Sequence, residues 1–200
     1  PGGTANLFGK NQPEGKPLYT GTSGEDVNQY LFDNQLTLLN RLKKDDRRTR
    51  QVISLPGMCQ YRTTRRIDGD YTLKVSDVYR HFEDSITAVN DFEHRNFLYE
   101  IPYRTLVRKG YDNLITAGRS ASGEGYAWDI VRVIPPAILT GQAAGCAAAQ
   151  ALSDGVGIDG IDVPKLQNTL ARQNVLLHFD DSWIPKEGEP EVKEGPSNHI

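Results

Sequence analysis

The stretch TGQAAGCAAAQAL, residues 140–152, predicts a helix with one side almost free of side chains. Gly141, Gly145 and Ala149 recur at every fourth position, so they lie on one helix face. A glycine inside a helix costs roughly 1 kcal/mol relative to alanine, so stability alone explains the two glycines poorly. The amides and the positive dipole end of the first turn favour negative charge. The pattern therefore predicts either tight packing of the helix on a sheet or contact with an anionic ligand.

The residues before this helix add groups that suit such a ligand. Pro135 and Pro136 favour a helix start, where their missing amides would have had no partner. The run DNLITAG, residues 112–118, is typical of a buried strand. Arg119 follows it, and a guanidinium donates several hydrogen bonds to hydroxyl or phosphate oxygens. We expect the strand, the arginine and the helix to converge on one ligand.

Two glycine patterns resemble known motifs but lack a decisive residue. GEGYAW has Trp128 where a dinucleotide-binding fingerprint has its third glycine, which allows a helix to pack against its strand. GRSAS has Ser122 where a nucleophile elbow has the second glycine that relieves the turn. A serine hydrolase that uses Ser120 is therefore the weakest of the functions considered.

The histidines and cysteines give no sequence signal for a metal site. His81, His94, His178 and His199 show no metal-ligand spacing, and the two cysteines form no CxxC pair. We therefore expect neither a bound metal nor a disulfide framework. His94 lies beside carboxylates and an arginine just before an expected strand, which makes it a candidate acid or base.

The composition is that of a globular chain. Its 200 residues are 38 % hydrophobic, which is enough to bury a core. With 23 basic and 26 acidic side chains the net charge is -3, so nothing attracts the chain as a whole to nucleic acid or an anionic membrane. No apolar run approaches the ~20 residues of a membrane span. The chain opens without Met or signal peptide, so we expect a piece of a longer protein, and its compartment stays open.

Helices are expected at both ends of the chain. Residues 23–42 predict one, with Ser23 as cap, Asp26 completing a capping box, and an apolar face made by Val27, Tyr30, Leu31, Leu38, Leu39 and Leu42. Another begins at Pro164 after Asp162 and turns Leu166, Leu170 and Val175 inward.

Strands are expected between these helices. Asp68-Gly69 lies between β-rich runs and predicts a hairpin. SITAVNDF and FLYEIPYRTLV predict further strands. The tail from Lys186 is rich in Glu, Pro and Gly and has little to bury, so we expect it to be disordered.

Several ordered motifs together resemble a known family. RTTRRIDGDYTLKVSDV, YEIPYRTLV, DNLITAGRSAS and VRVIPPAILTGQAAGCAAAQAL closely resemble the C-terminal half of bacterial FAD-dependent oxidoreductases, in the glutathione-reductase-like flavoprotein group. VPKLQNTLARQNVLL resembles the helix that ends those proteins. The resemblance covers roughly residues 25–177.

The resemblance implies an α+β chain that is part of an α/β flavoprotein. Residues 1–24 would be an irregular lead-in, 25–112 a helix and a β-rich segment of the substrate domain, 113–180 the returning strand and helices of a Rossmann-like FAD domain, and 181–200 a disordered tail. The implied FAD contacts are Gly118, Arg119, Arg132, Val133, Gly141, Gln142 and Ala143. The candidate polar groups for a small-molecule substrate are Arg65, Arg66, His94, Tyr103 and Arg104, any of which could instead bridge two domains.

One part of the family pattern is missing from the sequence. These flavoproteins begin with a GxGxxG turn for the pyrophosphate and an acidic residue ~20 positions later, and neither occurs here. We therefore expect this chain to be the C-terminal portion of a hydride-transferring flavoenzyme. Its expected partner is the N-terminal half of the same enzyme. Alone this chain would bind FAD weakly or not at all and would be inactive. A non-enzymatic β-rich binding module is the main alternative.

Overall fold

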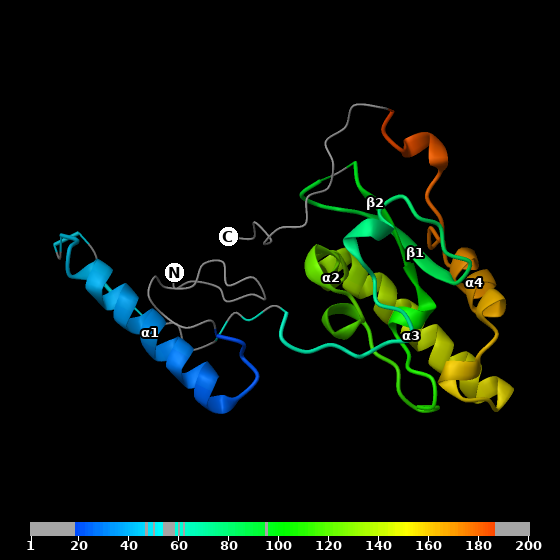
Figure 1. Cartoon of the computed structure of the whole chain (residues 1–200), viewed down its shortest axis with the longest axis horizontal. Helices are drawn as coiled ribbons and strands as arrows, with labels where there is room; N and C mark the ends of the chain where they lie inside the picture. Colours follow the sequence, from blue (N-terminus) through cyan, green and yellow to red (C-terminus); the bar gives the residue numbers. More distant parts are fainter. Residues whose placement is uncertain are drawn as a thin grey trace. The chain divides into compact units, whose positions relative to one another are not determined.

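The computed structural model of the chain describes residues 19–46, 48–49, 51–53, 59, 61, 63–94 and 96–186 (Figure 1). Within this part there are four α-helices and one two-stranded antiparallel sheet, joined by short 3-10 turns. This mixture agrees with the expected α+β class. The described residues divide into two compact units, one before and one after the Arg65–Arg66 bond.

Some expectations lie outside these residues or stay predictions. Most of the irregular lead-in and of the C-terminal tail falls on residues 1–18 and 187–200, which are outside the described ranges. The predicted domain limit between residues 112 and 113 refers to domains of a longer flavoprotein. It stays a prediction, as does the Rossmann-like arrangement.

The first unit is built on helix α1, Gly24–Leu42, which confirms the predicted N-terminal helix. Ser23 Oγ accepts the Asp26 N–H at 3.1 Å, as a cap should. The Asp26 carboxylate accepts the Thr20 and Gly21 amides, so it completes no capping box with Ser23.

The predicted apolar face of α1 is buried mainly at one position. Tyr30 is buried and packs its ring against Tyr19 and Tyr61. Toward the end of the helix Leu38 is only partly buried and Leu39 is exposed. The face therefore packs most closely near the start of the helix.

The second unit has the sheet at its centre. Strand β1, Ser85–Asn90, pairs antiparallel with β2, Leu98–Pro102, with Ala88 opposite Glu100. Both strands were predicted. Ile86 and Ile101 are fully buried, because α3 and α4 pack against β1 (Figure 1).

The predicted hairpin at Asp68-Gly69 is wrong. None of the described residues from 63 to 74 lies in a strand. This segment bonds residue by residue to other parts of the chain, through Ile67 N–H to Ser120 O, Asp70 N–H to Val107 O, Tyr71 N–H to Arg104 O and Leu73 N–H to Ser122 O. A Cβ at Gly69 would lie 2.8 Å from the Arg104 carbonyl oxygen, so this glycine serves a close approach and not a turn.

The predicted strand at residues 112–118 is also wrong, because no strand forms there. Its one ladder contact is an isolated bridge between Ile115 and Val107, and Leu114 is exposed. A strand needs neighbours for its amide and carbonyl groups, and the described chain supplies one such contact here.

Three helices complete the second unit. They are α2, Gly125–Arg132, α3, Ile134–Asp154, and α4, Val163–Arg172. Helix α3 confirms the prediction, with prolines in its first turn and Gly155 ending it at φ 65°. Helix α4 is capped by Asp162, which also confirms the prediction. Helix α2 was not predicted from the sequence.

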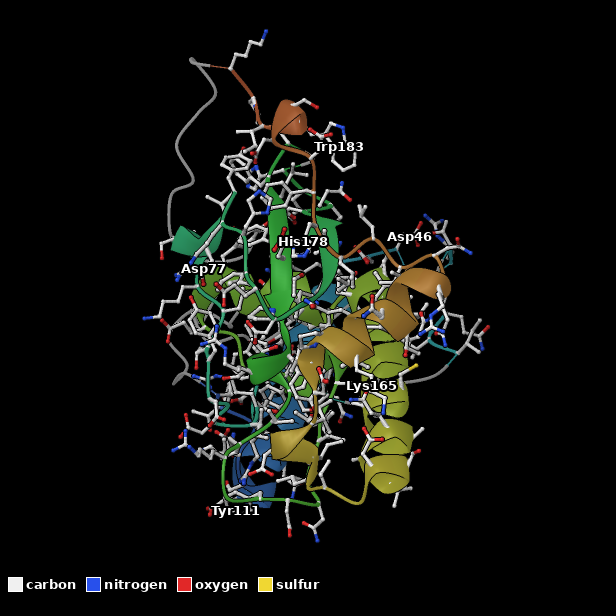
Figure 2. The ribbon with its side chains drawn as sticks, turned by 90° about the vertical axis from the view of Figure 1, so that its right-hand side faces the viewer. Asp46, Asp77, Tyr111, Lys165, His178 and Trp183 are labelled. Atoms are coloured by element: carbon white, nitrogen blue, oxygen red, sulfur yellow. The ribbon has the colours of Figure 1, made fainter. Side chains whose placement is uncertain are left out.

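Helices α3 and α4 pack against each other and against strand β1. Lys165 lies on α4 (Figure 2). Its Nζ is 2.6 Å from Oδ1 of Asp154, at the end of α3. Leu166 and Leu170 of α4 and Val175 after it are buried, as predicted.

No single helix in the described ranges is long and apolar enough to cross a membrane. Helices α2 and α3 reach that length and composition only when taken together, across a bend of 76°.

We expect Leu166→Ala to lower the free energy of unfolding by about 2–5 kcal/mol, because it removes a fully buried side chain. The matched control is Leu152→Ala on α3, where the side chain is 85 % exposed and the cost should stay below about 0.5 kcal/mol. Denaturant unfolding followed by tryptophan fluorescence measures both. Equal costs would contradict the observed packing of α4.

Candidate functional site

Gly118, at the end of the 112–118 segment, packs closely against the start of α3. Its φ of 59° is in the left-handed region, and its N–H donates to Thr140 Oγ1 at 2.9 Å. A Cβ at Gly118 would lie 3.1 Å from the Ala137 Cβ. Only glycine therefore fits well here, and the next residue, Arg119, is held close to the first turns of α3.

Two arginines flank the same tryptophan of α2. The Trp128 Nε1–H donates to the Arg119 carbonyl oxygen at 2.8 Å. The Arg66 guanidinium lies 5.9 Å from the centre of the Trp128 ring and donates to Ser122 Oγ at 3.0 Å. The Arg119 side chain is exposed and forms no ion pair within the described residues. The Arg119 guanidinium is therefore open to solvent.

Helix α3 packs against the second unit through alanines. Ala143 and Ala147 are fully buried and Ala151 nearly so. This face contacts β1, so small side chains allow the helix axis to come close to the sheet. The tight packing considered at first therefore involves the alanines and not the glycines.

The opposite face of α3, which we call the outward face, is open. A Cβ added at Gly141 or Gly145 would meet no atom within 4 Å in the described chain. Ile134 and Ile138 precede these glycines on the same face and are 76 % and 64 % exposed, and Leu152 follows them. An exposed apolar surface therefore runs along the helix, and its middle part, at the two glycines, has no side chains.

The first turn of α3 offers fewer amides than expected. Pro135 and Pro136 have no N–H, and the Ala137 N–H already donates to the Val133 carbonyl oxygen at 3.0 Å. Ile134 is the one residue of this turn with an amide left for a ligand. The turn therefore presents its dipole and apolar surface more than hydrogen-bond donors.

The remaining implied FAD contacts are engaged within the chain. The Arg132 guanidinium pairs with Asp129, and both side chains are 7 % exposed. Gln142 Nε2 donates to Gln173 Oε1 at 2.7 Å, and the Ala143 side chain is buried. Val133 joins α2 to α3.

Tyr103 and Arg104, two of the five candidate substrate groups, have structural partners. Tyr103 is buried, its hydroxyl donates to the Ile158 carbonyl oxygen at 2.7 Å, and burial raises its pKa. Arg104 makes two hydrogen bonds to Asp84, at 2.9 and 3.1 Å, which raise its pKa, and it lies over the Tyr71 ring.

The other three candidates lie in different surroundings. The His94 ring packs on Phe97 and on Tyr126 of α2. Arg65 donates to the Thr22 carbonyl oxygen within the first unit. Arg66 contacts Trp128 of α2, as described above. Among the described residues, no hydrogen bond or ring contact joins the five candidates into one group.

Ser120 shows no nucleophile arrangement. Its hydroxyl donates to the Ala117 carbonyl oxygen at 3.1 Å and shares a hydrogen bond with Thr116. Within the described residues no histidine is hydrogen-bonded to it, so a base that would activate it is not in place.

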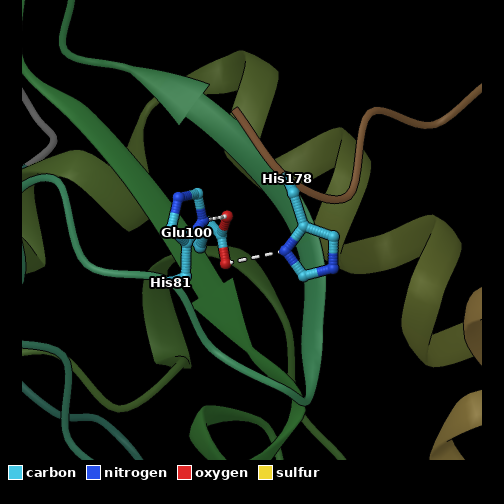
Figure 3. A group of neighbouring side chains, drawn as sticks. All are labelled: His81, Glu100 and His178. Carbon is cyan, nitrogen blue, oxygen red and sulfur yellow. Dashed lines mark hydrogen bonds and ion pairs between the residues drawn. The ribbon is translucent and has the colours of Figure 1, made fainter. Parts of the chain in front are cut away.

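One cluster was not visible in the sequence. His81 and His178 both contact the buried carboxylate of Glu100 (Figure 3). Hydrogen bonds to Asp181 and to Glu100 raise the pKa of His81. The three residues come from separate segments, so no local spacing indicates the cluster.

A family model described as FAD dependent oxidoreductase matches residues 19–170. The chain belongs to this family. No curated protein and no solved structure matches it. Membership of this family supports a flavin-dependent oxidoreductase function, and the family uses FAD.

We expect Gly141→Ala and Gly145→Ala each to raise the free energy of unfolding, by up to about 1 kcal/mol, because both positions are helical and open. Gly118→Ala should lower it by about 1–2 kcal/mol, because φ is positive and the Ala137 side chain is close. Thermal and denaturant unfolding of the three variants measures this. A loss of stability at Gly141 would show that the outward face is packed after all.

Proposed function

We propose that this chain supplies part of the substrate domain and the returning part of the FAD domain of an enzyme that oxidises a small molecule. The observation that carries this proposal is the open outward face of α3, which lies close to the 118–120 turn that carries the exposed Arg119. The family match supports the cofactor and the reaction class.

The residues fit one side of the cofactor. Gly118 lies over Ala137, and Gly141 follows Ala137 by one helical turn on the same surface. The Gly118 turn and Gly141 therefore both lie along the first two turns of α3, and no atom of the described chain would meet a Cβ at Gly141. A flat ring system can approach such a surface closely, whereas a branched side chain at position 141 would hold it away.

Each of these residues would have a distinct task. Arg119 would bind oxygens of the cofactor and orient it. The positive end of the α3 dipole would favour negative charge that develops at the cofactor. Ile134 and Ile138 would exclude water from the reacting region. When bound, FAD supplies the capacity to accept a hydride from a substrate carbon.

The other implied FAD contacts would act indirectly, by holding α3 and the α2–α3 junction in place. The Arg132 guanidinium is neutralised by Asp129, so this pair would fix the junction at Val133 and not bind FAD directly. The Gln142 bond to Gln173 and the buried Ala143 would hold α3 in place.

On the substrate side we propose Arg66 and His94 as the candidates to test first. Both contact α2, through Trp128 and Tyr126 respectively, and α2 packs against α3 and the Gly118 turn. The other three candidates have the engaged partners described above.

We propose further that FAD binding needs a dinucleotide-binding segment outside the given sequence. The pyrophosphate needs a glycine-rich turn before a helix. The present chain would then bind FAD weakly or not at all by itself and would be inactive.

The test is the visible spectrum of this chain joined to its native N-terminal half. We expect a yellow protein with bound FAD. Gly141→Val should remove most of the FAD, because the branched side chain occupies the contact surface. Ala149→Val, two turns further along the outward face, should retain it. A colourless parent protein would overturn the proposed function, and equal FAD content in the two variants would overturn the proposed contact.

A further inference from the structure

We infer that His81, Glu100 and His178 form a binding site for a divalent transition-metal ion, for which Zn²⁺ is the best-suited probe. This site is independent of the proposed flavin contacts and uses none of their residues. It also differs from the sequence expectation of no metal, which was based on histidine spacing alone.

The donor atoms converge on one point. His81 Nδ1 lies 2.6 Å from Glu100 Oε1, and His178 Nδ1 lies 3.0 Å from Glu100 Oε2 (Figure 3). One ligand atom from each of the three residues lies within 4.8 Å of the others. Tetrahedral donors about 2.0–2.1 Å from a zinc ion are about 3.3–3.4 Å apart, so the cluster needs to close by at most about 1.5 Å.

The carboxylate of Glu100, between the two histidines, requires a compensating positive charge. Glu100 is fully buried, and a buried carboxylate is costly unless a charge compensates it. Within the described residues its ion-pair partners are the two histidines, with no lysine or arginine beside them. A divalent ion would compensate this charge and would replace the imidazole protons that now face the carboxylate.

The ligands are held by rigid parts of the fold. Glu100 is in the middle of β2, and its Oε2 accepts the Phe82 N–H at 2.8 Å, which fixes the carboxylate plane. The segment that carries His178 is tied to β1, because the Ala88 N–H donates to Leu176 O at 2.7 Å and Ser85 Oγ donates to Leu177 O at 2.6 Å. Both anchors immediately precede His178.

The His81 ring has an outer partner of the kind that metal-binding histidines use. Its Nε2 lies 2.8 Å from Asp181 Oδ1, and the ring stacks on Phe179 with 4.3 Å between centroids. A carboxylate on Nε2 holds the proton there and leaves Nδ1 for the metal. This arrangement orients His81 toward Glu100.

The site is accessible and incompletely enclosed. The His81 and His178 side chains are 43 % and 47 % exposed, so an ion can enter from solvent. Two imidazoles and one carboxylate suit Zn²⁺ and related ions, and three protein ligands leave a coordination position for water or another ligand. Binding would also fasten the segment after α4 to the sheet.

The test is titration of the full chain in metal-free buffer. Zn²⁺ is followed by calorimetry and Co²⁺ by its visible absorption. We expect saturable binding of one ion per chain and a higher melting temperature with Zn²⁺. His178→Ala, at a half-exposed position, should weaken binding by about tenfold or more. Glu100→Gln should do the same where it folds. The matched control, His94→Ala, should leave the affinity unchanged.

Three results would overturn the inference. They are the absence of saturable binding in the parent chain, an unchanged affinity in His178→Ala, and an equal loss in His94→Ala and His178→Ala. The titration needs neither FAD nor activity, so its failure is distinct from a failure of the proposed function.

Discussion

The close packing of α3 on the sheet determines where the implied FAD contacts on α3 lie. Ala143 and Ala147 allow the helix to approach β1, and Gly118 allows the preceding segment to cross the helix at Ala137. A larger side chain at any of these points would separate the elements and move Arg119 with them. The same packing turns Gly141 outward, where nothing in the described chain explains a glycine.

This division of α3 into two faces changes how its first turn acts. A helix start rich in amides would bind an anion by hydrogen bonds, but Pro135 and Pro136 remove two of those donors. What remains is a dipole, an arginine close by and exposed isoleucines. Such a surface suits a large, flat, partly apolar group better than a bare phosphate, which agrees with the family to which the chain belongs.

The sequence predicted features that have local causes. Ser23 and Asp162 begin helices and Gly155 ends one, because capping depends on a few adjacent residues. The hairpin at Asp68-Gly69 was wrong, because partners distant in sequence bind that segment. The pairs Arg132 with Asp129 and His81 with Glu100 were missed for different reasons. The first is a local pair that can be read only once α2 is recognised, and the second joins segments that no periodic pattern connects.

A crystal structure of the full-length protein with FAD bound tests the central claim most directly. The account predicts that atoms of FAD lie in van der Waals contact, within about 4 Å, with the outward face of α3 between Ile134 and Gly141. It also predicts that the Arg119 guanidinium is hydrogen-bonded to the cofactor. FAD bound elsewhere, with this face open to solvent or covered by a protein segment, would contradict the account.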